Sequence, residues 1–276
     1  GGSFMSAVSG DGIWTSAILA GVALVWLAIM LGVRELVKRR QDRSASIGTA
    51  LVTDSDVLYV RCSIEPHPEA AMLKLYYSPG ACALASHVAL EESGAPYEAV
   101  RIDLGKGEHK TPAYLAINPA GVTPALETER GVITQNAAIL GFIAQTRPQQ
   151  NLAPVGDPYR MARFNAFNGY LASSLHPAIG KALFSRPALE GEARADAVEV
   201  ALTRLQLIED SLLEGPWVMG DAYTLADGYL MVFERWARAA DLLDSARFAR
   251  LNGHLDRTQE RAAVQRVLAA EGLEVA

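Results

Sequence analysis

The sequence predicts an α/β unit followed by an all-helical unit, with an apolar segment upstream of both. Three observations lead to this fold class. Short apolar strands alternate with helices between residues 72 and 150, apolar residues recur at helical spacing from residue 158 onward, and residues 13–33 carry no charge. A chain of 276 residues is long enough for two such domains and an appendage.

The uncharged run at residues 13–33 would span about 30 Å as a helix, the thickness of one bilayer core. A buried helix of a soluble domain is seldom apolar on every face, and residues 1–12 lack the cations of a signal peptide. A basic cluster follows the run: Arg34, Lys38, Arg39, Arg40 and Arg43. We therefore expect residues 1–40 to be a membrane anchor with an outside N-terminus and a cytoplasmic C-terminal body.

Residues 41–71 show no regular pattern beyond one strand-like stretch at residues 57–60. The segment begins with polar residues and ends in a proline-containing stretch, which favours a linker. Cys62 lies here without a partner motif, so we interpret it as a plain linker thiol.

The first half of the α/β unit begins with an apolar strand at residues 73–77, which a Pro-Gly pair ends. A helix is expected at residues 82–93, with Gly94 as its stop signal. Residues 96–103 then read as a second strand, with two β-branched residues on one face.

The second half of this unit contains a short helix at residues 112–116 and a hairpin. The hairpin strands are expected at residues 124–128 and 132–134, with a tight turn between them. Asn136 is expected to cap a final helix that runs to about Arg147, where a proline stops it.

The unit at residues 158–276 is expected to be entirely helical. Five apolar residues at spacings of three and four mark one buried helix face: Val198, Leu202, Leu205, Ile208 and Leu212. Thr224 and Asp227 form a variant of the capping box, which opens another helix.

Composition excludes several kinds of partner and site. The formal net charge of −6 argues against a nucleic-acid partner, because phosphate binding needs a basic face. The two cysteines and five histidines show no metal-ligand spacing, so we expect no metal site. Two cysteines are also too few for a disulfide scaffold, which fits a reducing cytosol.

The segment YYSPGACALASHVAL at residues 76–90 raises the main functional question. It places Cys82 at the start of a helix, directly after a strand and a Pro-Gly turn. Such a cysteine is either an inert small core residue or a reactive centre.

Six motifs together resemble a bacterial glutathione transferase of the beta class. They are MLKLYYSPGACALASHVALEESG, INPAGVTPAL, ITQNAAI, LHPAIGKALF, TLADGYL and VLAAEGL, in the order and at the separations of that family. The resemblance covers residues 72–271 and leaves residues 1–71 outside. It implies a thioredoxin-like glutathione-binding domain at residues 72–150 and an all-helical domain at residues 158–276.

The resemblance also implies what the thiol does. In a thioredoxin-like fold Cys82 lies at a helix N-terminus, where free N–H groups and the helix dipole favour a thiolate facing the sulfur of glutathione. Ala85 stands three residues later, so there is no C-x-x-C pair, and only glutathione could supply a second sulfur. Thr123 and Pro124 resemble the residue and cis-proline whose backbone pairs with the cysteinyl part of glutathione.

Further binding residues are implied in the same way. The helix start at Gln135 and Asn136 would receive the γ-glutamyl end, with Asn136 presenting N–H donors to the carboxylate. Lys106 is the candidate partner of the glycyl carboxylate. His176 matches a histidine that orients or protonates the sulfur, and His87 is expected to be a packing residue. Ser173 and Ser174 are expected to bind glutathione across a dimer interface.

The sequence departs from the family pattern at Ala83, Gln135 and Gly169, where the family has Ser, an acidic residue and Asn. Ala83 and Gly169 remove hydrogen-bonding groups and Gln135 removes a charge, so these departures support an alternative, a non-catalytic interaction module with the same fold. The principal expectation is a homodimeric enzyme with glutathione as cosubstrate, which conjugates it to a small hydrophobic electrophile or exchanges thiols through Cys82. The enzyme would be held at the inner (cell) membrane by residues 13–33, or be wholly cytoplasmic if translation starts at Met72.

Overall fold

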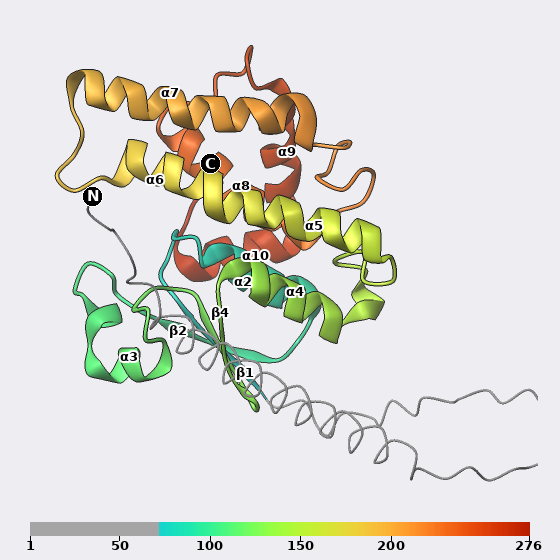
Figure 1. Cartoon of the computed structure of the whole chain (residues 1–276). Coiled ribbons are helices and arrows are strands. Elements are labelled where there is room, and N and C mark those ends of the chain that lie inside the picture. Colours follow the sequence, from blue (N-terminus) through green and yellow to red (C-terminus); the bar gives the residue numbers. More distant parts are fainter. Residues whose placement is uncertain (1–71) are drawn as a thin grey trace, which may run out of the picture. The chain divides into compact units, whose positions relative to one another are not determined.

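The computed structural model describes residues 72–276, which begin with a four-stranded sheet (Figure 1). The strand order is β2-β1-β3-β4; β1 pairs in parallel with β2 and antiparallel with β3, and β3 pairs antiparallel with β4. The strands are β1 (Leu73–Tyr77), β2 (Tyr97–Arg101), β3 (Ala125–Thr128) and β4 (Gly131–Thr134). The expected strands and hairpin are confirmed, with boundaries that differ by no more than two residues.

Helices cover both faces of this sheet because side chains alternate along each strand. Leu75 and Leu126 point into the main core, whereas Tyr76 and Ala125 pack with Tyr114 in a smaller cluster on the other face. The helices and 3₁₀ turns are α2 (Leu84–Ser93), η1 (Glu108–Lys110), α3 (Pro112–Ile117), α4 (Asn136–Thr146) and η2 (Pro148–Gln150).

The start of α2 differs from the prediction by two residues. The helix begins at Leu84, so Cys82 lies in the preceding turn, where its carbonyl accepts the N–H of Ala85 at 3.2 Å. The predicted stop is confirmed, since Gly94 adopts a left-handed φ of 64° and its N–H caps the carbonyl of Glu91.

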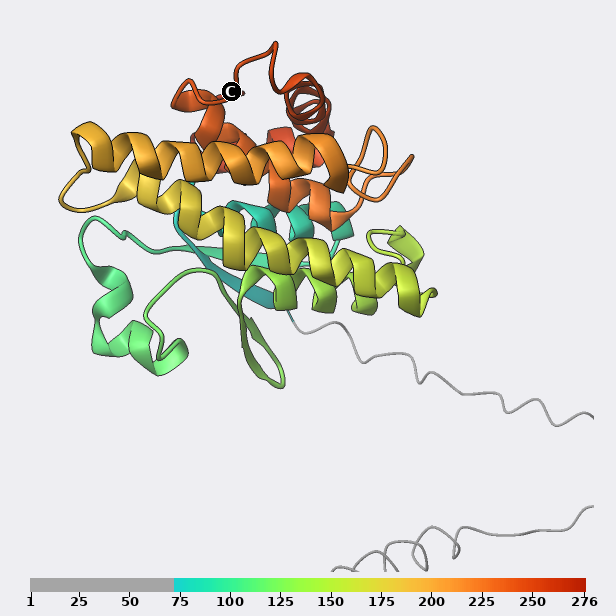
Figure 2. The same cartoon turned by 45° about the horizontal axis from the view of Figure 1, so that its top comes forward.

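The remaining chain is helical, as predicted. Helices α5 and α6 run as one line with a π-helical turn between them, and α7 packs along that line (Figure 1; Figure 2). The elements are α5 (Pro158–Tyr170), the π-turn η3 (Leu171–Leu175), α6 (His176–Phe184), α7 (Gly191–Leu207), the π-turn η4 (Ile208–Leu212), α8 (Leu225–Ala239), α9 (Ala249–Gln259) and α10 (Ala262–Glu271).

The predicted buried face of α7 is only partly confirmed. Leu205 and Ile208 are buried, but Val198, Leu202 and Leu212 are half-buried. The small residues Ala197 and Ala201 occupy the centre of the face, because α6 packs closely against this helix.

The predicted capping box at the start of α8 is confirmed. The two residues form the reciprocal hydrogen bonds of a capping box, in which the Asp227 carboxylate accepts the backbone N–H of Thr224. The same carboxylate also accepts the Val218 N–H at 2.6 Å. His254 of α9 links this carboxylate to Glu234, with nitrogen–oxygen distances of 3.0 and 2.9 Å. The two carboxylates raise the pKa of His254 to about 10 against the opposing effect of burial.

One hydrophobic core joins the two halves. It includes Leu75 of β1, Val88 of α2, Leu230 of α8 and Leu268 of α10. Helix α2 therefore packs on the sheet on one side and on α8 and α10 on the other. The turn before α2 consequently lies where the sheet domain meets the helical domain.

The predicted anchor at residues 13–33 and linker at residues 41–71 lie outside the described residues. Across residues 72–276, none of the helices combines the length and the apolar character that a membrane span requires.

Candidate active site at the start of α2

The turn between β1 and α2 is held by groups from the helical domain. Gly80 adopts a φ of 68°, which a glycine accepts without strain. Its N–H donates to the Glu271 carboxylate of α10 at 2.8 Å, and its carbonyl accepts the indole N–H of Trp236 at 2.9 Å. Two residues later, Cys82 is therefore fixed in position by contacts from both domains.

The thiol of Cys82 is partly buried and donates to the carbonyl of Thr123 at 3.6 Å. Burial raises its pKa to about 11, although Asn136 and the backbone N–H groups of Cys82 and Ala83 lower it. The backbone N–H groups favour the thiolate, as the resemblance implied, but burial opposes it. At neutral pH the removal of the sulfur from water outweighs the helix N-terminus, and Cys82 carries its proton.

The peptide bond between Thr123 and Pro124 is cis, as the resemblance implied. The Thr123 carbonyl, which lies just before β3, accepts the hydrogen bond of the Cys82 thiol. Thr123 itself is buried.

The start of α4 differs from the prediction. The N-cap position belongs to Gln135, an exposed residue with a φ of 72°, and Asn136 is the first helical residue. The Asn136 side chain caps nothing. It is buried, donates to the Cys82 carbonyl at 2.9 Å and accepts the Ser86 hydroxyl at 2.7 Å. The predicted cap is wrong because two polar groups of the α2 segment take its amide.

His176 begins α6 and packs against aromatic rings of α8. Its ring centroid lies 5.4 Å from that of Phe233 and 5.5 Å from that of Trp236. Burial lowers the pKa of His176, so the imidazole is neutral at neutral pH. Through Trp236, His176 adjoins the Gly80 turn that precedes Cys82.

Comparisons with known proteins agree with this arrangement. Residues 71–145 match the family model "Glutathione S-transferase, N-terminal domain". Glutathione S-transferase GST-4.5 of Xanthomonas campestris is 37% identical over 206 residues, which are 73% of this chain and 100% of the relative. The chain belongs to the glutathione S-transferase family.

Two solved glutathione S-transferases have the same fold. A sphingomonad enzyme complexed with glutathione is 38% identical, with a TM-score of 0.65, and covers 73% of this chain and 100% of its own. A beta-class glutathione S-transferase of Sphingomonas chungbukensis is 34% identical, with the same TM-score and coverage. The described residues thus contain both a glutathione S-transferase sheet domain and its helical domain.

The remaining predicted residues of this transferase lie at different distances from the thiol turn. Ser173 and Ser174 lie in the π-turn before His176, and the Ser173 hydroxyl donates to the carbonyl of Gly169 at 2.8 Å. The side chain of Lys106 is 77% exposed and pairs with Asp103 at 3.4 Å. No contact in the structure joins Lys106 to the Cys82 turn within the described residues.

Sequence reasoning missed the residues of the helical domain that hold the turn. Glu271 and Trp236, which both contact Gly80, were not expected at the site. His87 is buried as expected, and its Nδ1 lies 2.7 Å from the Glu271 carboxylate. The one signal for Glu271 was an acid at the end of the otherwise apolar VLAAEGL motif.

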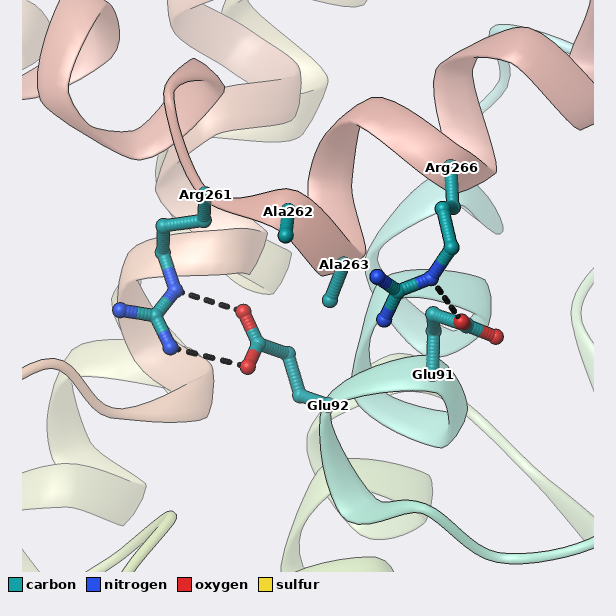
Figure 3. A pocket seen from close by; sticks show the side chains of 6 residues that line it. All are labelled: Glu91, Glu92, Arg261, Ala262, Ala263 and Arg266. Carbon is teal, nitrogen blue, oxygen red and sulfur yellow. Dashed lines mark hydrogen bonds and ion pairs between the residues drawn. The ribbon is translucent and has the colours of Figure 1, made fainter.

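A cavity of about 300 Å³ lies at the opposite, C-terminal end of α2 (Figure 3). Its charges pair across the domain boundary: Arg261 contacts Glu92 through two hydrogen bonds of 2.6 and 2.9 Å, and Arg266 contacts Glu91 at 2.5 Å. Each carboxylate of the lining pairs with an arginine of the other domain, so we assign this cavity to domain packing. Among residues 72–276 there is also no cluster of three side chains suited to a metal ion.

Proposed function

We propose that this chain is a glutathione transferase that binds reduced glutathione with its cysteinyl part along Thr123 and its sulfur facing Cys82. The contact between the Cys82 sulfur and the Thr123 carbonyl carries the proposal. It places a sulfhydryl donor beside the backbone that would pair with the peptide. Solved family members of this fold include one complexed with glutathione, which supports the same ligand here.

The two ends of glutathione would bind on either side of this point. The start of α4 would take the γ-glutamyl carboxylate, through its free backbone N–H groups and the exposed Gln135 side chain. Lys106 would pair with the glycyl carboxylate by a rotation of its exposed side chain. Ser173 and Ser174 would reach the glutathione of a second subunit. The neutral Gln135 offers no charge to the ligand's ammonium, which weakens affinity.

The protonated state of Cys82 favours conjugation over thiol exchange as the main reaction. In conjugation the glutathione thiolate attacks the electrophilic carbon, a C–S bond forms, and the leaving group departs with the electron pair of its own bond. Cys82 would donate its S–H to the glutathione sulfur and stabilise that anion. The neutral imidazole of His176 would take up the proton that glutathione releases.

Thiol exchange would proceed from the minor thiolate form of Cys82. The thiolate attacks a mixed disulfide of glutathione and an acceptor thiol, the Cys82–glutathione S–S bond forms, and the acceptor leaves as thiolate. A second glutathione thiolate would then release oxidised glutathione and restore Cys82. Only thiolate attacks, so a thiol pKa of about 11 makes this branch slow at neutral pH.

The electrophile would be a small hydrophobic molecule, bound against the aromatic side chains that surround His176. Phe184 is exposed, and its ring lies edge-on to Trp236 at 5.1 Å between centroids. We also propose a homodimer, supported by the exposed apolar side chains Val200 and Leu207 on α7. The uncharged run at residues 13–33 supports an inner-membrane anchor that keeps the enzyme in the glutathione-rich cytoplasm.

Binding to immobilised glutathione tests the function. We expect retention, elution by free glutathione, and thermal stabilisation by millimolar glutathione. A protein that flows through and gains no thermal stability would instead support the non-catalytic interaction module, which Ala83, Gln135 and Gly169 favour.

A further inference from the structure

Residues 272–276 leave the end of α10 through a glycine turn. Gly272 adopts a φ of 70°, and its N–H donates to the carbonyl of Ala269. The N–H of Leu273 donates to the carbonyl of Leu268 at 2.8 Å. Together these bonds form a Schellman motif, in which the residue after the glycine packs back on the protein. The side chain of Leu273 accordingly packs against the main core.

Side chains of α8 and α9 hold the last part of this segment. The guanidinium of Arg235 donates to the carbonyl of Glu274 at 2.7 Å. The carbonyl of Ala276 accepts from Arg238 at 3.1 Å and from the amide of Gln259 at 3.2 Å. The N–H of Ala276 donates to the same amide at 2.8 Å, and Arg235 also donates to it. The segment is therefore fixed to two helices although it has no regular secondary structure of its own.

The side chain of Leu273 lies over the turn that precedes Cys82. A Cβ atom added at Gly80 would lie 3.5 Å from one methyl group of Leu273 and 3.9 Å from the other, which is van der Waals contact. Apart from the chain neighbours of Gly80, no other atom of the described residues comes within 4 Å of that position. The N–H and the carbonyl of Gly80 are already bonded to Glu271 and Trp236. Because glycine has the most conformational freedom to lose, a side chain packed on this face restrains the turn.

We propose that Leu273 is a positioning residue for the Cys82 turn, and that residues 272–276 form a strap that keeps Leu273 on it. Arg235 fastens the strap to α8, and the next residue of that helix, Trp236, bonds the turn itself. The strap and the turn are thus fixed to the same helix. The inference rests on the proposed function for its consequence in catalysis, but the mobility of the turn can be measured without glutathione.

Hydrogen–deuterium exchange of full-length variants tests the strap. In Leu273→Ala the backbone N–H groups of residues 78–84 should exchange about five- to tenfold faster than in the wild type, because the contact that restrains Gly80 is lost. Arg235→Ala releases the carbonyl of Glu274 and should act in the same direction. Exchange in α7 should stay unchanged in both variants, which separates a local release of the turn from a general loss of stability.

Two matched controls should leave exchange in residues 78–84 at the wild-type rate. Val275→Ala shortens a side chain of the strap that is 62% exposed. Arg163→Ala removes a guanidinium that pairs with Glu214 at 2.9 Å, elsewhere in the helical domain. Melting temperatures measured beside each exchange curve verify that every variant is folded.

Two conservative variants should restore most of the protection. Leu273→Met keeps an apolar side chain of similar volume over Gly80. Arg235→Lys keeps one cationic donor for the carbonyl of Glu274. Slow exchange in these two variants, beside fast exchange in the alanine variants, would assign the effect to the contact and to its anchor.

Alkylation of Cys82 by iodoacetamide gives a second measurement, in a Cys62→Ser background that leaves Cys82 as the sole thiol. The thiol is partly buried, and a loosened turn exposes it, so Leu273→Ala should react about two- to fivefold faster. In conjugation of glutathione to chlorodinitrobenzene, kcat should fall about threefold in Leu273→Ala. The KM for glutathione should stay within about twofold, because the glutathione contacts proposed at Thr123 and α4 lie outside the strap.

Wild-type exchange of residues 78–84 in folded Leu273→Ala or folded Arg235→Ala would overturn the proposal. An equal rise of exchange in α7 would overturn it too, since the residues would then have only a general structural role. If Leu273→Ala does not fold, Arg235→Ala and Arg235→Lys decide in the same way. If glutathione does not bind even to the wild type, the proposed function fails, while the exchange rates still decide the role of the strap.

Discussion

The carboxylate of Glu271 accepts the backbone N–H of Gly80 at 2.8 Å, although the two residues are 191 positions apart. Its other oxygen contacts His87 at 2.7 Å, and its side chain is fully buried. One carboxylate from the last helix of the described residues thus bonds both to the turn before Cys82 and to the helix after it.

Glu271→Ala should destabilise the protein by about 2–4 kcal/mol, because it leaves the half-buried Gly80 N–H and the buried His87 ring without their partner. Urea unfolding measures this loss. Glu271→Gln retains an acceptor oxygen and should lose less, and Glu274→Ala, a change at an exposed residue, should stay within about 0.5 kcal/mol of the wild type. Equal stability of Glu271→Ala and Glu274→Ala would contradict the role of the carboxylate.

Substitution of Cys82 should separate the two reactions. In a Cys62→Ser background, Cys82→Ala should abolish thiol exchange, because no thiolate is left to attack a disulfide. Conjugation should survive at a rate reduced about tenfold, since one hydrogen-bond donor to the sulfur anion is lost. Cys82→Ser keeps a donor and should conjugate faster than Cys82→Ala. Exchange that persists in Cys82→Ala would exclude Cys82 as the exchanging thiol.

Stability should fall as the pH rises from 7 to 8.5. The folded pKa of His254, about 10, lies above its ordinary value of 6.5, so its stabilising effect is complete below pH 6.5 and is lost as the pH rises toward 10. The slope approaches about 1.4 kcal/mol per pH unit within that range. The Cys82 thiol, whose ordinary pKa of 9.0 rises to about 11 in the fold, adds to this loss of stability only as the pH approaches 9. His254→Gln should remove most of the slope, and a wild-type curve that stays flat would refute the charged histidine.

The sequence was sufficient for features that neighbouring residues determine. Strand alternation, the Gly94 stop and the Thr224–Asp227 capping box all depend on residues a few positions apart. It was insufficient where a distant segment competes with a local preference. Asn136 at a helix start favours a cap, but Ser86 and the Cys82 carbonyl bind its amide instead.

The thiol of Cys82 is the second such case. A helix N-terminus predicts a thiolate, yet burial raises the thiol pKa to about 11. The helix that brings Trp236 to this turn begins more than 140 residues later in the chain. Sequence patterns show which groups could stabilise the anion, but they do not show how much water the fold removes from it.

The fragment at residues 72–276 should sediment as a dimer at micromolar concentration. It contains both domains of the transferase, and α7 carries the exposed apolar residues Val200 and Leu207. Analytical ultracentrifugation over a dilution series provides the measurement. A monomer throughout that range would contradict the proposed homodimer and the contribution of Ser173 and Ser174 to a neighbouring site.

Cells that express the gene from its own upstream region should yield the full-length chain in the membrane fraction. The reason is the uncharged run at residues 13–33 with its basic flank. Cell fractionation measures how the chain divides between membrane and supernatant, with the fragment at residues 72–276 as the control. A product of about 205 residues, counted from Met72 and found only in the supernatant, would reject the anchor and leave the proposed chemistry unaffected.

The π-helical turn at Leu171–Leu175 has a consequence for how this family member can vary in length. A π-turn holds one residue more than an α-turn, and one residue advances a helix by about 100°. His176 and Phe184 lie at the two ends of α6, so the turn sets the rotation of both residues about the helix axis. Deleting one residue from the turn would rotate both aromatic side chains together, so insertions or deletions here cannot reorient His176 independently of Phe184, which would line the proposed electrophile site.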